Sequence, residues 1–331
     1  MKAKSATSRP PMTEVVGIEL GSSSDTTTPI VRLRRRADGV IELVAAELVA
    51  FDSTIPVSPD KIPEGVSLIL PKHFHVNAAA LALSSESAVL RQAAGVDDAL
   101  SDKDKSLYRT MVFSQEGDPL SFVAAIPEHM AAWAAQLLPE GRKPTACSIQ
   151  ISNLARINAF TVSAEFQKTN GSALLLLVDR RTTALVIFCN FKPLLYREHS
   201  IGSEDVIDAV CREMNLDRPT VENILNDTLI DPTAVLEPVL APLFRQAELS
   251  TDYAIRKNNC FIDKFFLCGL TAGSHYWADI FKRKTGGEII PCNPLDNFPT
   301  APGAQLPPDF DTCSGRFIPA IGAAVAVLED A

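Results

Sequence analysis

Three β-rich runs decide the fold class: TEVVGIEL at Thr13–Leu20, IVRLR at Ile30–Arg34 and VIELVAAEL at Val40–Leu48. The turn Ala37-Asp38-Gly39 separates the last two runs. Asp-Gly between two apolar runs is a strong hairpin signal. The chain is therefore predicted to open with an antiparallel meander.

The same pattern returns in the second half of the chain. Ser172–Val178, Thr183–Phe188 and Pro193–Glu198 read as a second meander, and Ser203–Met214 follows as an amphipathic helix. A meander followed by α/β elements thus occurs twice, although no residue-level repeat is visible. This duplication predicts two related α/β lobes around a cleft.

The segments between and after the meanders are predicted from composition. The alanine-rich stretch Asn77–Ala94 is expected to be helical at least in part, and Leu120–Ile126 is expected to be a strand. Glu128–Leu138 reads as a helix, Pro299–Pro308 as a proline-rich loop and Phe317–Leu328 as a small-residue apolar helix. The chain therefore continues as a mixed α/β protein to its last helix.

Composition excludes several classes of protein. The net charge of −9 argues against a nucleic-acid binder, which needs a basic surface to neutralise phosphates. No apolar run is long enough to cross a bilayer. The seven cysteines are odd in number and none form a C-x-x-C pair, so a disulfide framework or zinc site is not expected. The chain reads as a cytoplasmic protein with a flexible N-terminal tail at 1–12.

Several landmarks, in order, resemble one family. The run VGIELGSSS at Val16–Ser24 resembles the first phosphate loop of the actin-like superfamily, in particular of PilM, the cytoplasmic actin-like component of type IV pilus assembly. Leu177-Val178-Asp179 with Thr182-Thr183 resembles its second phosphate hairpin, and Phe266–Gly273 lies where the family has its adenosine motif. Asn293-Pro294-Leu295 is similar to the segment after that motif. The resemblance covers about Thr13–Leu328.

The resemblance implies a fold and a division into domains. The fold is the actin-like, two-lobed one, built from duplicated ribonuclease H-like βββαβα lobes, with an inserted subdomain in the first lobe as in the cell-division protein FtsA. The implied first lobe is 13–71 plus 140–168 plus 313–331, the inserted subdomain is 72–139, and the second lobe is 171–312.

The resemblance also implies a function and partners. A PilM-like protein is a scaffold at the cytoplasmic side of the inner membrane of a type IV pilus or related secretion assembly. Its implied partner is the short cytoplasmic tail of a PilN-like bitopic membrane protein, with pilus motor ATPases as further partners. Neither nucleic acid nor a membrane span of its own is implied.

The implied nucleotide cleft departs from the family pattern. Glu19 replaces an aspartate that helps to hold Mg²⁺, the turn Asp179–Thr183 lacks a glycine, and Leu270-Thr271 replace interior glycines of the adenosine motif. Loss of glycine prevents close approach of backbone N–H groups to phosphate. No catalytic residue and no required cofactor are therefore predicted, although the resemblance allows weak binding of ATP with Mg²⁺. The cleft residues are Glu19, Gly21, Ser22, Ser23, Ser24, Asp179, Thr182, Thr183, Gly269 and Gly273.

Two alternative functions are known for proteins of the same superfold. An ATP-dependent small-molecule kinase needs a general base near the acceptor hydroxyl, and the sequence shows no convincing one. An FtsA-like polymerising protein usually ends in a basic amphipathic membrane helix, whereas the given sequence ends at Leu328-Glu329-Asp330-Ala331. The scaffold hypothesis is favoured over both.

Overall fold

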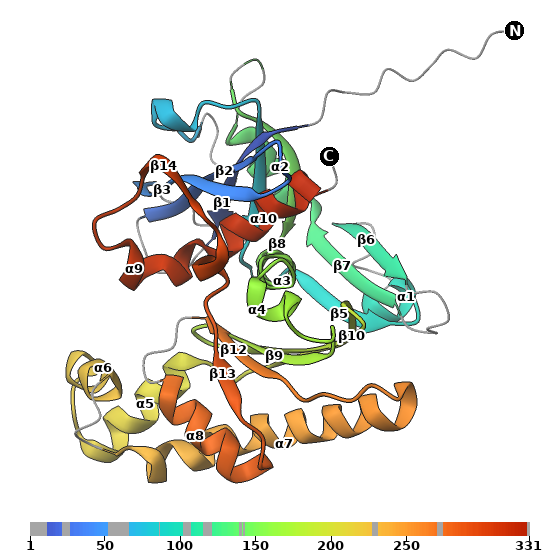
Figure 1. The fold of residues 1–331 in the computed structure, drawn as a ribbon, viewed down its shortest axis with the longest axis vertical. Helices are drawn as coiled ribbons and strands as arrows, with labels where there is room; N and C mark the ends of the chain where they lie inside the picture. Colours follow the sequence, from blue (N-terminus) through green and yellow to red (C-terminus); the bar gives the residue numbers. More distant parts are fainter. Residues whose placement is uncertain are drawn as a thin grey trace, which may run out of the picture.

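The computed structural model consists of two lobes and a smaller inserted sheet (Figure 1). The described residues are 12–21, 27–51, 66–85, 87–101, 107–114, 121–138, 141, 143–226, 231–269 and 274–329. The first lobe is built on a six-stranded sheet, the second on a five-stranded sheet, and the inserted sheet has three strands. The predicted two-lobed α/β architecture is confirmed.

The first lobe begins with the predicted meander. β1 (Glu14–Leu20), β2 (Thr27–Arg35) and β3 (Ile41–Ala50) pair in antiparallel fashion. Three parallel strands complete the sheet, whose order is β14-β3-β2-β1-β4-β8. These strands are β4 (Ala78–Leu83), β8 (Thr145–Ile151) and β14 (Thr300–Gln305).

Two helices cover one face of this sheet. α10 (Ile318–Glu329) packs on β1, β2 and β4, and also on α3 (Ser152–Thr161). The approach is close because small residues lie between them. A methyl group on Gly17 would lie 1.8 Å from the carbonyl oxygen of Ala320, and one on Gly322 would lie 1.7 Å from the carbonyl oxygen of Ala155.

The second lobe repeats the topology. Its sheet has the order β11-β10-β9-β12-β13, so β9, β10 and β11 correspond to β1, β2 and β3. The strands are β9 (Ala173–Val178), β10 (Thr183–Cys189), β11 (Lys192–His199), β12 (Phe265–Gly269) and β13 (Ile289–Pro291). The helices of this lobe are α5 (Ser203–Met214), α6 (Arg218–Asn226), α7 (Thr233–Asn258) and α8 (Ser274–Thr285).

The inserted sheet has the order β5-β7-β6 and lies beside the first lobe (Figure 1). Its strands are β5 (Val89–Ala93), β6 (Tyr108–Ser114) and β7 (Ser121–Pro127), accompanied by α1 (Val96–Ala99) and α2 (Glu128–Gln136). The remaining short helices are α4 (Ala164–Gln167), α9 (Phe310–Cys313), η2 (Lys72–Phe74), η4 (Pro294–Asn297) and η5 (Ser314–Phe317).

The alanine-rich stretch Asn77–Ala94 was wrongly predicted as helical. It forms β4 and β5, and β4 lies between β1 and β8 in the first-lobe sheet. Ala78, Ala80 and Ala82 face α10, where only small side chains allow the helix to approach. The inserted part of the chain therefore begins after β4, not at Lys72 as the sequence suggested.

The proline-rich segment Pro299–Pro308 was also wrongly predicted. Its residues Thr300–Gln305 form β14, which pairs with β3 at the edge of the first-lobe sheet, where proline is tolerated. Leu295 and Phe310 pack in the first-lobe core as well. The second lobe therefore ends earlier in the chain than residue 312, the limit that the resemblance implied.

Two of the seven cysteines are paired. Cys268 and Cys292 form a disulfide. The parallel pairing of β12 with β13 places Leu267 opposite Pro291, so the next residues on the two strands are neighbours. The two cysteines are 24 residues apart in the sequence, so no local pattern predicted their contact.

We predict that Gly17→Ala destabilises the protein by about 1–3 kcal/mol, because the added methyl group must push α10 away from β1. Urea unfolding followed by circular dichroism measures the change. Gly95→Ala is the control, since a methyl group there meets no atom within 4 Å, and its effect should stay within about 0.5 kcal/mol. Equal effects of the two substitutions would contradict the packing argument.

Candidate functional site

The candidate site lies where the ends of β1 and β9 meet between the lobes. Glu19 is near the end of β1, Asp179 follows β9, and Arg156 extends from α3 toward both. Arg156 Nη2 lies 3.0 Å from Asp179 Oδ2, and the hydroxyl of Ser152 donates to Glu19 Oε1 at 3.4 Å. One residue from each predicted phosphate loop thus joins a single charged cluster.

Glu19 is a buried carboxyl group with an unusual pKa. Burial raises the pKa of Glu19 to about 7, and the negative charge of Asp179 adds to this effect. The positive charges of Arg156 and Arg316 and the hydrogen bond from Ser152 act in the opposite direction. Glu19 therefore keeps its proton to a higher pH than an exposed glutamate does.

Arg156 supplies the positive charge of the cluster. Burial lowers the pKa of Arg156, but the carboxylates of Asp179 and Glu19 outweigh burial and hold the pKa above its usual value. Only 12% of the Arg156 side chain is exposed, against 30% of the Asp179 side chain. The guanidinium group is thus a partly buried ionic link from the first lobe to the second.

Apart from the Asp179–Arg156 pair, the polar groups of the second phosphate hairpin described next bond within their own lobe. The N–H of Arg180 donates to Asp179 Oδ1 at 2.7 Å, and the N–H of Asp179 donates to the carbonyl of Thr182 at 2.8 Å. Glu204 accepts hydrogen bonds from the side chains of Arg180 and Arg181. Buried Thr183 donates its hydroxyl to the carbonyl of Ile201 at 2.7 Å, away from the cluster.

The third predicted motif is described only at its start. Gly269 ends β12 with φ +125°, and a methyl group on it would lie 2.0 Å from the carbonyl oxygen of Val178. Gly269 therefore lets β12 pack beside the end of β9. Gly21 has φ 85° and directly follows β1. The predicted cleft residues Ser22, Ser23, Ser24 and Gly273 lie outside the described residues.

Several residues at this junction were not predicted as site residues. Arg156 is one of them, and Arg316, on η5 before α10, is another and donates to Thr27 Oγ1 at 3.0 Å. Asn153 Nδ2 donates to the hydroxyl of Tyr196 at 3.1 Å, a second polar link between the lobes. In the sequence, the signal for this cluster is the charged Arg156 within α3.

Apolar contacts join the lobes as well. One hydrophobic core contains Ile18 and Leu20 from the first sheet together with Leu175 and Leu177 from the second. Rings of Phe160, Phe166, Phe188 and Phe266 pack with centroids 4.8–5.6 Å apart. The cluster of Glu19, Arg156 and Asp179 thus lies beside a core that both lobes share.

Comparison with known proteins identifies the fold. No protein-family model matches the chain, and no curated protein sequence does. Among solved structures, a chain of the PilM-PilN type IV pilus biogenesis complex matches with a TM-score of 0.64 at 19% identity, over 96% of this chain and 99% of that chain. The chain has an actin-like fold of the PilM kind.

Two other solved structures match less well than the PilM-PilN chain. One is a protein with actin-like ATPase fold and unknown function from Bacteroides thetaiotaomicron, with a TM-score of 0.45, 10% identity and coverage of 85% of this chain and 91% of that chain. The other is the ethanolamine utilization protein EutJ from Carboxydothermus hydrogenoformans, with a TM-score of 0.46, 14% identity and coverage of 96% and 91%.

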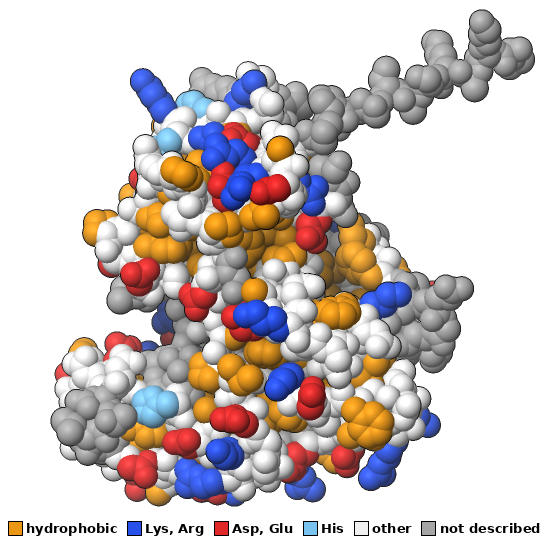
Figure 2. Space-filling view, in the orientation of Figure 1, with side chains coloured by type: hydrophobic (Ala, Val, Ile, Leu, Met, Phe, Trp, Pro, Cys, Tyr) orange, Lys and Arg blue, Asp and Glu red, His pale blue; other side chains and the backbone are white. Residues whose placement is uncertain are grey.

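The arginine-rich hairpin of this PilM-like fold is largely neutralised by acids. Arg32 pairs with Glu14 at 2.7 Å, Arg34 pairs with Glu42, and Arg36 pairs with Asp38 at 2.7 Å. Figure 2 shows blue and red side chains mixed over this end of the first lobe. The hairpin is therefore not a uniformly basic surface.

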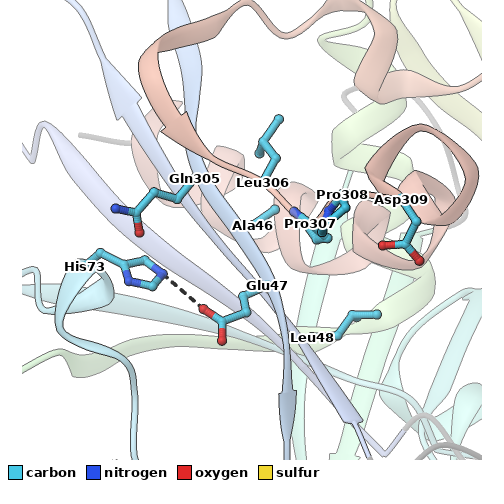
Figure 3. Close-up of a pocket in the computed structure, with 9 residues that line it drawn as sticks. All are labelled: Ala46, Glu47, Leu48, His73, Gln305, Leu306, Pro307, Pro308 and Asp309. Carbon is cyan, nitrogen blue, oxygen red and sulfur yellow. Dashed lines mark ion pairs between the residues drawn. The ribbon is translucent and has the colours of Figure 1, made fainter.

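The resemblance also places a partner peptide in a groove between the first lobe and the inserted subdomain, with Pro71–Val76 and Phe122–Pro127 as candidate lining. Phe122–Pro127 belongs to β7, which is buried and paired on both edges by β5 and β6. That stretch offers no free strand edge, so a peptide could not pair with β7 as an added strand. In Pro71–Val76, Phe74 is buried, but His73 lines a surface pocket (Figure 3).

We predict that Glu19 makes the stability of the folded chain depend on pH. Its raised pKa means that the folded protein binds this proton more tightly than the unfolded chain, so stability falls as pH rises from about 4.5 to about 7. The loss attributable to Glu19 is about 3 kcal/mol. Urea unfolding across this pH range should show a steeper decline for the native protein than for Glu19→Gln. Parallel curves would contradict the assignment.

Proposed function

We propose that this protein is a PilM-like cytoplasmic scaffold of a type IV pilus or related secretion assembly. It holds the cytoplasmic tail of a PilN-like bitopic inner-membrane protein. The observation that carries the proposal is the likeness, over nearly the full length of both chains, to a chain of the PilM-PilN complex. Pilus motor ATPases are the further partners that such a scaffold would connect.

The proposal places the protein at the inner membrane through its partner. Among the described residues, no helix is long and apolar enough to cross a membrane. A tail that is extended and disordered when free loses conformational entropy on binding, so it needs backbone hydrogen bonds and a few anchoring side chains. The scaffold therefore requires a preformed surface for an extended peptide.

We also infer that the protein is a pseudo-ATPase. The fold family implies ATP with Mg²⁺, but the described cleft groups already have partners. The carboxylate of Asp179 is paired with Arg156 and accepts a hydrogen bond from the N–H of Arg180. A cation would compete with Arg156 for this carboxylate, and a phosphate would compete with the carboxylate for the Arg180 N–H. Burial raises the pKa of Glu19 to about 7, so a cation there would have to displace its proton. These internal partners support weak or absent binding of the nucleotide, and no reaction step is assigned to it.

We predict that ATP with Mg²⁺ gives no saturable heat in the micromolar range by calorimetry. Phosphate release should equal the buffer background, because the cleft groups are satisfied internally. Asp179→Asn is the informative variant, since it keeps the shape of the residue and removes its charge. Micromolar binding, or turnover that Asp179→Asn abolishes, would show that the protein is a working ATPase.

We predict that the protein binds at least one cytoplasmic tail of the bitopic membrane proteins encoded beside its gene. Synthetic tails labelled with a fluorophore and titrated with the protein measure this by anisotropy. Scrambled tails of the same composition are the control, since they keep the charge and lose the order of anchors. The scaffold proposal fails if every native tail binds no better than its scrambled form.

A further inference from the structure

β6 is a free edge of the inserted sheet. In the order β5-β7-β6, one side of β6 pairs with β7 from Tyr108 to Ser114, and no strand in the described part of the chain pairs with its other side. Figure 1 shows the inserted sheet at the periphery of the molecule, on the right of the view. Along the free side, alternate residues direct their N–H and C=O groups away from β7, as at any antiparallel edge.

The side chains of β6 are largely apolar and exposed. Met111 is 58% exposed, Val112 44% and Phe113 40%. Neighbouring side chains on a strand point to opposite faces, so both faces of β6 present apolar groups. Arg109 is the one charged residue of this strand, and its guanidinium group is paired with Glu128. An exposed apolar edge whose charge is neutralised readily pairs with another chain.

Other sheet edges in the described part of the chain carry features that discourage such pairing. β13 is three residues long and ends in Pro291, and β14 contains Pro302 and Gly303. The edge of β11 is met by the inserted sheet, where Gln92 donates to the carbonyl of Leu194. Short strands, prolines and covered edges are the usual protection. β6 is seven residues long and contains neither proline nor glycine, so it lacks this protection.

The sequence of β6 complements itself in an antiparallel pair. A two-fold axis through Met111, the middle residue of the strand, pairs the full length of β6 with a second copy. Met111 then lies opposite Met111 of the second copy. Thr110 lies opposite Val112, and Arg109 lies opposite Phe113. The charged residue thus faces an aromatic ring instead of its own copy, and a guanidinium group is attracted to such a ring.

We propose that a second copy of this chain covers β6, so that an antiparallel β6–β6 contact joins two three-stranded inserted sheets into one. Backbone hydrogen bonds supply the affinity, and the self-complementary side chains select a second copy as the partner. The net charge of −9 repels two copies, but salt screens this repulsion beyond ~8 Å, and β6 itself contains no acid. The inference is independent of the proposed scaffold function, which assigns no role to β6.

The first test measures the mass of the protein by sedimentation velocity at about 1–100 μM, the range in which a small interface dissociates. The mass of the native protein should rise from 35.8 kDa toward twice that value. Met111→Lys should raise the Kd of the dimer about tenfold or more, because two lysines then lie opposite each other, and Met111→Glu should do the same. An equimolar mixture of the two variants should regain the dimer, since lysine then faces glutamate.

Leu249→Lys is the matched control. Leu249 is an exposed apolar residue on α7 in the second lobe, and its substitution should change the Kd by less than about twofold. The inference is overturned if the native protein keeps the mass of one chain at every concentration. It is also overturned if Met111→Lys dimerises as the native protein does, or if the mixture of the two Met111 variants stays monomeric.

Hydrogen exchange locates the contact independently of mass. Raising the protein concentration should slow exchange of the β6 amides that do not bond to β7, and it should leave the amides of β3 unchanged. Met111→Lys should show no such dependence on concentration. Slower exchange at β3 instead of β6 would place the contact between copies on another edge and overturn the inference.

Discussion

The relative position of the two lobes depends on the ionic contact between Arg156 and Asp179. Arg156 comes from the first lobe and Asp179 from the second, and Glu19 lies beside them under α3. Removing charges from water costs several kcal/mol per ion, and the attraction between paired charges offsets this cost. Opening the lobes at this point separates the pair and exposes the core that both sheets share. The contact and the core therefore favour the same closed arrangement.

Within the proposed function, this arrangement gives the scaffold a fixed shape. Proteins that close around a ligand need an interface with two arrangements of similar free energy. Here the ionic contact, the Asn153–Tyr196 hydrogen bond and the packed phenylalanine rings all stabilise one arrangement. A rigid body presents its outer strands in fixed positions, which lowers the entropy lost when a flexible peptide binds.

The meanders and the lobe duplication were predictable because their signals are local. Alternating apolar residues and the Asp38-Gly39 turn are read from neighbouring positions. β4 was missed because alanine favours a helix in isolation, and only the closeness of α10 explains alanine in a central strand. The pairing of β14 with β3 joins residues more than 250 positions apart. Arg156 acquires its role only when α3 faces the second lobe, which no local pattern records.

The edges of the two meanders show how the chain limits unwanted strand pairing. The edge of β11 is met by the inserted sheet, where Gln92 Nε2 donates to the carbonyl of Leu194 at 2.8 Å. The edge of β3 is covered by β14 only as far as Ala45. An uncovered edge normally invites aggregation, and a charged residue such as Glu47 discourages it. The same charge repels acidic strands, so Glu47 disfavours pairing of β3 edges between copies of this acidic protein.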